Sequence, residues 1–118
     1  MIKKKHYNRL DVLDRSFNFK ENVIKFGKNE TFEHFLGKCL IAWELSNTNL
    51  DFYTEAIFKG KKRSDFFVLD WNQAIEIVKS ESSKSIIEKE SSYPVRLTVI
   101  TTKKIFNDNK ELLRKCLD

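Results

Sequence analysis

The spacing of apolar positions predicts one amphipathic helix early in the chain. Between residues 32 and 43, apolar side chains recur at i, i+3, i+4, i+7, i+8 and i+11, the spacing of one helical face. These positions are Phe32, Phe35, Leu36, Cys39, Leu40 and Trp43. Asn29 or Thr31 can cap the helix, and the polar run 46–49 can end it.

Three β-rich segments follow this helix at short intervals. Residues 50–58 alternate in polarity, residues 65–70 are almost entirely apolar, and residues 74–79 are apolar around one glutamate. Because the connections between them are short, the pattern predicts a meander of antiparallel strands. Residues 65–70 lack polar alternation, so we expect that strand to be buried on both faces.

The remaining pattern predicts a short helix, a strand and a last helix. The only proline, Pro94, introduces the β-rich run 95–102. Asp108 and Glu111 have the spacing of a capping box at the start of the last helix. The predicted fold class is α/β, in the order helix, three-strand meander, helix, strand, helix, with a mixed central sheet.

Composition indicates a single globular domain. Of the 118 residues, 41% are hydrophobic and 33% are charged, which excludes a disordered chain, and no apolar run is long enough to span a membrane. Residues 1–28 fit neither period and are interpreted as an N-terminal arm, which leaves residues 29–118 as one α/β domain. The basic start of the chain lacks the apolar stretch of a signal peptide, which favours a cytoplasmic protein without a membrane partner.

The cysteines, aromatic residues and net charge exclude few classes of function. Cys39 and Cys116 lie in apolar helical patterns and are interpreted as reduced core residues rather than zinc ligands. The ten phenylalanines, with Trp43 and Trp71, are interpreted as packing residues, because no aromatic strand motif of an RNA-binding sheet occurs. The net charge of +5 favours nucleic acid as a partner.

Two carboxylates stand in strands that should be buried. Asp65 opens the second predicted strand, and Glu76 lies inside the third, where both faces are largely apolar. A buried carboxylate is costly unless it is paired or bound to a metal ion. Since the turn between the strands is short, the two acids could converge on one Mg²⁺ ion. The alternative is that Asp65 caps a turn and Glu76 pairs with a lysine of another element.

This order of elements, with acids at these two positions, resembles the PD-(D/E)xK nuclease superfamily, and within it the small archaeal Holliday-junction-resolvase-like nucleases. The resemblance covers residues 29–102 and implies a restriction-endonuclease-like core. It implies that Asp65 and Glu76 hold the metal ion, completed by Glu33, with Glu30 as the fallback. It further implies a metal-dependent endonuclease that uses Mg²⁺ or Mn²⁺, acts on DNA and could assemble as a homodimer.

One position departs from the family's motif. The motif lysine should stand two residues after the acid, where this chain has Val78. Lys79 follows one residue later and points to the opposite face of a regular strand. Lysines of this superfamily can come from other elements, and Lys38 is a candidate because it forms a polar stripe with Glu30 and His34 on the first helix. His34 is itself a candidate base.

A basic cluster precedes Asp65 at the tip of the first predicted hairpin. It consists of Lys59, Lys61, Lys62 and Arg63. Such a cluster can contact DNA phosphates beside a metal site, or can simply keep a hairpin tip soluble. Three hypotheses follow: a metal-dependent DNA endonuclease, a catalytically inactive nuclease-fold module that binds DNA or a protein, and a small interaction protein whose acids are surface residues.

Overall fold

The computed structural model describes residues 20–60 and 62–117. Residues 1–19 of the predicted N-terminal arm lie outside this description, as does Lys61 of the basic cluster. The elements are, in order, β1 (Lys20–Glu21), α1 (Phe32–Asn47), β2 (Phe52–Ile57), β3 (Arg63–Val68), a 3₁₀ turn (Leu69–Trp71), β4 (Gln73–Val78), α2 (Ser83–Ser92), β5 (Arg96–Thr101), α3 (Thr102–Asp108) and α4 (Lys110–Leu117).

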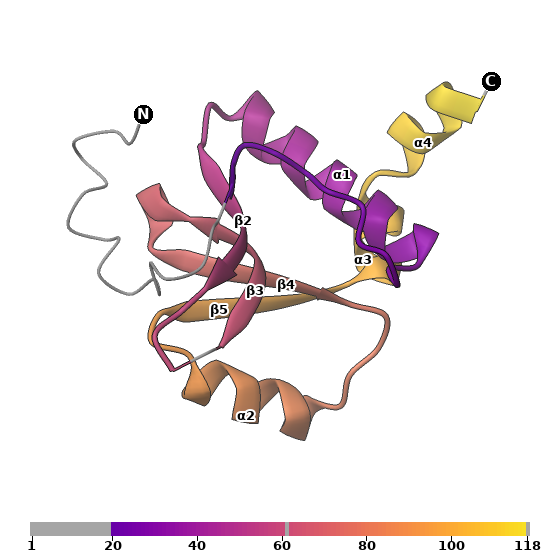
Figure 1. Cartoon of the computed structure of the whole chain (residues 1–118). Coiled ribbons are helices and arrows are strands. Elements are labelled where there is room, and N and C mark those ends of the chain that lie inside the picture. The colour runs from indigo at the N-terminus through magenta and orange to yellow at the C-terminus, as the bar shows by residue number, and fades with distance from the viewer. Residues whose placement is uncertain (1–19, 61, 118) are drawn as a thin grey trace.

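A mixed sheet of five strands forms the centre of the fold, in the order β1-β2-β3-β4-β5 (Figure 1). The strands from β1 to β4 are antiparallel neighbours, whereas β5 runs parallel to β4. A parallel pair needs a crossover connection, and α2 supplies it. The predicted α/β class with a mixed sheet is therefore confirmed, as is the order of helix, meander, helix and strand.

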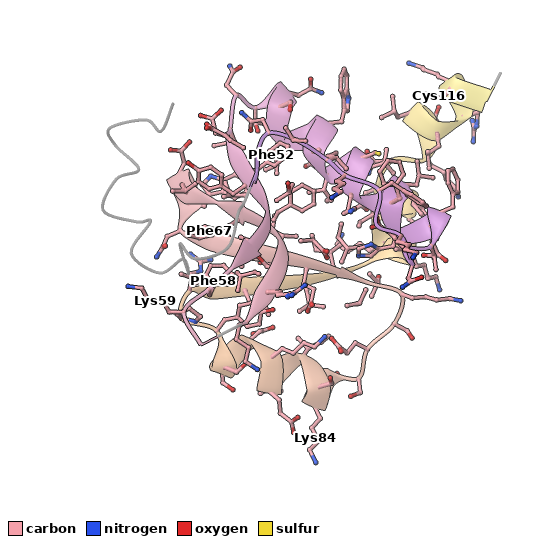
Figure 2. The ribbon with its side chains drawn as sticks, viewed as in Figure 1. Phe52, Phe58, Lys59, Phe67, Lys84 and Cys116 are labelled. Atoms are coloured by element: carbon pink, nitrogen blue, oxygen red, sulfur yellow. The ribbon has the colours of Figure 1, made fainter. Side chains whose placement is uncertain are left out.

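Helices lie on both faces of this sheet. In Figure 1, α1 and α3 cover one face, and α2 lies on the other. The side chains of β3 alternate between two cores: Phe66 packs with Phe52 and α1, and Phe67 packs with Phe58 on the α2 side (Figure 2). Phe66, Phe67 and Val68 are fully buried, so the prediction that this strand is buried on both faces is confirmed.

Helix α1 begins where the sequence indicates but presents a different face to the sheet. The Oγ1 of Thr31 accepts a hydrogen bond from the amide of His34 at 3.1 Å and caps the helix. The buried residues are Gly37, Leu40, Ile41, Ala42 and Leu45. Phe32 and Trp43, which were predicted to lie on the buried face, are exposed instead. The helix carries two neighbouring apolar stripes, and packing against the sheet determines which of them is buried.

The end of the chain differs from the prediction of one helix. Helix α3 starts directly after β5, because the Oγ1 of Thr101 caps it by accepting a hydrogen bond from the amide of Lys104 at 3.2 Å. Helix α4 then follows as a separate element. Both cysteines are free thiols, but Cys116 on α4 is exposed and Cys39 is half-buried, so Cys116 is not the core residue that was predicted.

No helix in residues 20–60 or 62–117 is long and apolar enough to cross a membrane.

Candidate functional site

A cleft of about 860 Å³ opens where β3 and β4 separate. The ladder between these strands ends at Phe66 and Ile75. Beyond that point β3 still pairs with β2, and β4 still pairs with β5 as far as Val78. The cleft is walled by residues of the loop before α1, the first turns of α1, the diverging ends of β3 and β4, and Thr102 at the start of α3.

Asp65 lies in the gap between the two strands. Its Oδ2 accepts a hydrogen bond from the backbone amide of Ile77 at 2.7 Å, in place of a ladder partner. The same oxygen lies 3.3 Å from Nε2 of His34 on α1. The Asp65 carboxylate therefore connects the open edge of β4 to the first turns of α1.

His34 lies between two carboxylates. Its Nδ1 contacts the Oε2 of Glu30, and its Nε2 faces Asp65. His34 is thus fixed at both ends in a chain from Glu30 to Asp65, and it lines the cleft.

Glu30 and Lys38 hold the loop before α1. Glu30 Oε1 accepts from the amide of Gly27 at 2.9 Å, and Glu30 Oε2 lies 2.9 Å from Lys38 Nζ. Lys38 Nζ also donates to the carbonyl oxygen of Lys25 at 2.8 Å. Burial alone would raise the pKa of Glu30, but the bonds from Gly27, Lys38 and His34 outweigh it and lower the pKa. Both side chains thus have structural partners.

Glu33 lies on the same wall of the cleft. Its Oε1 accepts a hydrogen bond from Oγ1 of the buried Thr102 at 2.6 Å, which ties the first turn of α1 to the start of α3. The predicted third acid of the metal site therefore lines the cleft together with Asp65 and Glu76.

Glu76 is held from the other face of the sheet. As predicted, it points away from Ile75 and Ile77, which pack in the core beneath α1. Its Oε2 lies 3.2 Å from Nζ of Lys89 on α2, and the same Nζ lies 2.8 Å from Oε1 of Glu81. The hydrogen bond with Glu81 outweighs burial and, with Glu76, raises the pKa of Lys89. This pairing is the alternative considered for Glu76 from the sequence.

Tyr93 packs against the core on the α2 side of the sheet. Its hydroxyl donates a hydrogen bond to the carbonyl oxygen of Arg63 at the start of β3. Burial, followed by the negative charge of Glu76, raises the pKa of Tyr93 to about 12. The phenol therefore stays neutral and keeps its donor throughout the ordinary pH range.

Basic residues flank the cleft on two sides. Lys79 is exposed on the cleft wall, as is Arg63 at the start of β3. Lys59 and Lys62 are exposed at the hairpin tip outside the cleft, and Lys59 points outward from the fold (Figure 2). Arg63 is thus the member of the predicted DNA-binding cluster that reaches the cleft wall.

The cleft brings together all the predicted catalytic and metal-binding side chains, but not as a closed ligand set. The residues are Glu33, His34, Lys38, Asp65, Glu76 and Lys79. Over residues 20–60 and 62–117, no three His, Cys, Asp or Glu side chains gather as metal ligands. Asp65 contacts His34 on α1, whereas Glu76 contacts Lys89 on α2.

Lys89, Glu81 and Tyr93 were missed in the sequence. A lysine of another element was anticipated as a partner for Glu76, but Lys84 and Lys89 of α2 were equivalent candidates. Figure 2 shows Lys84 pointing away from the fold, whereas Lys89 contacts Glu76. Only the packing of α2 against the sheet distinguishes them.

No family model, no curated protein and no solved structure matches this chain. The functional argument therefore depends on the residues of the cleft and on their chemistry.

Proposed function

We propose that the protein is a metal-dependent endonuclease that cleaves DNA phosphodiester bonds. The observation that carries this proposal is one cleft whose lining includes the carboxylates of Glu33, Asp65 and Glu76, together with the cations Arg63 and Lys79. Acids that bind a divalent ion beside cations that bind phosphate are the combination that phosphodiester hydrolysis needs. The order of elements from α1 to β5 agrees with the core implied by the resemblance.

The three carboxylates fit Mg²⁺ or Mn²⁺ by their donor chemistry. Hydrogen bonds to described residues use Oδ2 of Asp65, Oε2 of Glu76 and Oε1 of Glu33. Each acid thereby retains one oxygen for a ligand. Mg²⁺ is usually held by one or two carboxylates together with water and substrate phosphate, so Asp65 and Glu76 with help from Glu33 suffice. When bound, such an ion supplies a more acidic water and charge compensation for the phosphate.

The other side chains bind and orient the substrate. Arg63 and Lys79 would hold the DNA backbone at the cleft wall. Lys89 lies beside Glu76 and supplies a cation from α2, where Val78 occupies the motif position on β4. His34, fixed between Glu30 and Asp65, would hold the Asp65 carboxylate in position at the cleft.

A nicking assay tests this function. Supercoiled plasmid and a four-way branched DNA would be incubated with the protein in Mg²⁺, in Mn²⁺ and in EDTA. We expect nicked products with either metal ion and none in EDTA. Absence of cleavage by folded protein at saturating Mn²⁺, with both substrates, would contradict the proposal.

A second candidate is a nuclease-fold module that binds DNA without cutting it. Two observations favour it: Val78 stands where the motif lysine is expected, and Asp65 and Glu76 contact side chains of different helices. The same assay separates the two candidates when it is combined with a gel-shift measurement. DNA binding that persists without any metal-dependent cleavage would favour the module.

A further inference from the structure

Two phenylalanines next to the cleft are unusually exposed. Phe32 is 72% exposed and Phe26 is 53% exposed, whereas Phe52, Phe58 and Phe66 are fully buried. Burying an aromatic ring is worth about 1.5–3 kcal/mol, so these two rings leave a large apolar surface unused. Exposed apolar surface that gathers beside a cleft is typical of a binding site.

Both rings are adjacent to residues of the cleft wall. Phe26 lies between Lys25 and Gly27, and Phe32 lies between Thr31 and Glu33; all four of these neighbours line the cleft. Neither ring is part of the lining, but each residue is one position away from the wall of the opening that contains Asp65 and Glu76. We call Phe26 and Phe32 the aromatic rim.

The loop that carries Phe26 is held in place before any ligand arrives. Glu30 bonds to the amide of Gly27, and Lys38 bonds to the carbonyl of Lys25, so the backbone is fixed on both sides of Phe26. The ring of Phe26 also packs edge-on against Phe35, with centroids 5.1 Å apart and planes at 88°. A ring ordered in this way loses little conformational entropy when it stacks on a ligand.

Two lysines flank the Phe26 part of the aromatic rim, whereas Glu33 follows Phe32. Lys25 and Lys28 are exposed on either side of Phe26. Cations that follow a phosphate backbone, alternating with aromatic rings that stack on bases, are the features by which proteins bind single strands. In a duplex the faces of the bases are hidden in the stack, so only an unpaired base can present its face to Phe26 or Phe32.

We propose that the aromatic rim binds unpaired bases, so that the substrate of the cleft is a single-stranded segment of DNA. The identity of the ligand as nucleic acid rests on the function proposed above. The rim would stack on bases next to the scissile phosphate, while Lys25 and Lys28 contact the backbone.

Fluorescence anisotropy in EDTA tests the rim without cleavage and without a metal ion. The ligands are a labelled single strand of mixed sequence and the same sequence as a blunt duplex. We expect the wild type to prefer the single strand, and Phe32→Ala and Phe26→Leu each to weaken that binding about fivefold or more, with little effect on the duplex. Phe26→Leu retains apolar packing against Phe35 and so tests the aromatic face itself.

Two exposed tryptophans serve as matched controls. Trp43 is 55% exposed further along α1, and Trp71 is 49% exposed at the turn between β3 and β4, and neither is a sequence neighbour of a residue that lines the cleft. Trp43→Ala and Trp71→Ala should leave single-strand affinity unchanged. Preference for the duplex, unchanged affinity in both rim variants, or an equal loss in the tryptophan variants would overturn the inference.

The outcomes remain separable from those of the proposed function. A failure to nick DNA in Mn²⁺ would contradict the endonuclease but would not alter the single-strand preference measured in EDTA. Conversely, Phe32→Ala and Phe26→Leu could both cleave plasmid duplex and single strands as fast as the wild type. That result would support the endonuclease and contradict the proposed role of the aromatic rim.

Discussion

The acids on the α1 side of the cleft and those on the α2 side are held in different ways. On the α1 side, Glu30 is 8% exposed in its side chain and bonds to the loop amide of Gly27, to His34 and to Lys38. On the α2 side, Glu76 is 24% exposed in its side chain and shares the ammonium of Lys89 with Glu81. Both oxygens of Glu30 have partners, and these partners lie within eight residues of it in the sequence. On the α2 side, by contrast, two carboxylates share one lysine.

This difference separates structural acids from available ones. Both oxygens of Glu30 are occupied by described partners, and the lowered pKa keeps it ionised. Glu76 and Asp65 each use a single oxygen toward described residues. A divalent ion would therefore compete with Lys89 for Glu76 but would not need to open the bonds that hold the loop. Glu30 is accordingly a weaker ligand candidate than Glu33.

The largest effect is expected from Asp65, which lines the cleft and also accepts a hydrogen bond from the backbone of β4. Asp65→Ala should abolish metal-dependent cleavage and weaken Mn²⁺ binding, measured by calorimetry. It also removes the acceptor for the Ile77 amide, which should cost about 1–3 kcal/mol of the free energy of unfolding.

Asp65→Asn provides the control for that loss of stability. Asparagine retains an oxygen that can accept from the Ile77 amide but lacks the charge that holds a cation. We expect Asp65→Asn to unfold at a urea midpoint near that of the wild type and still to lack cleavage. Unaltered Mn²⁺ affinity in both variants would exclude Asp65 as a ligand.

The next largest effect should come from Lys89 on the opposite side of the sheet. Lys89→Gln should lower the rate of cleavage about a hundredfold, the lower end of the cost of losing one hydrogen-bond donor that stabilises the transition state. Metal affinity should rise in the same variant, because Glu76 and Glu81 lose their shared cation.

Lys84→Gln is the matched control, since Lys84 lies on the same helix and points into solvent (Figure 2). It should leave both rate and metal affinity unchanged, and Lys89→Arg should restore part of the rate. Equal rates in Lys89→Gln and the wild type would leave Lys89 as an ion-pair partner without a catalytic role.

The sequence predicts the strands and helix that form the cleft better than it predicts the side-chain contacts within the cleft. The all-apolar run at 65–70 identifies a strand buried on both faces, and Thr31 identifies the start of α1. These features depend on neighbouring residues, so local patterns reveal them. Local sequence does not determine which face of α1 is buried. Phe32 and Leu40 are both apolar, but only Leu40 packs against the sheet, and Phe32 stays exposed.

The candidate site shows the same limit. Its acids can be selected because a carboxylate in an apolar strand is energetically unusual. Their partners cannot, because the contact from Asp65 to His34 and the one from Glu76 to Lys89 join separate elements. The early start of α3 was missed for a related reason: Thr101 caps the helix from the last position of β5, inside a run that reads as strand.

A moderate effect on stability is expected at Tyr93, which packs against the core on the α2 side of the sheet. Tyr93→Phe removes the hydrogen bond to the Arg63 carbonyl, which should lower the free energy of unfolding by about 1 kcal/mol at pH 8. The pKa of Tyr93 in the folded protein, about 12, lies above the ordinary tyrosine value of 10.0. Wild-type stability from this group is therefore complete below pH 10 and is lost as the pH rises toward 12.

Because phenylalanine cannot ionise, Tyr93→Phe lacks this alkaline loss. Urea unfolding at pH 8, 10 and 11.5 should show the gap between wild type and variant narrowing as the pH rises. A gap that stays constant over this range would mean that the folded protein does not hold the phenol neutral.

The smallest effect is expected at the hairpin tip, outside both acid groups. Lys59 and Lys62 are exposed and do not line the cleft, so each would contribute only phosphate contacts. Lys59→Gln with Lys62→Gln should weaken DNA binding about two- to fivefold near physiological salt. It should also lower the slope of log affinity against log salt by about 1 to 2, since each contact releases roughly one counterion. Lys84→Gln again serves as the control, and an unaltered salt slope in the double variant would place the DNA path away from the hairpin and along the cleft wall between Arg63 and Lys79.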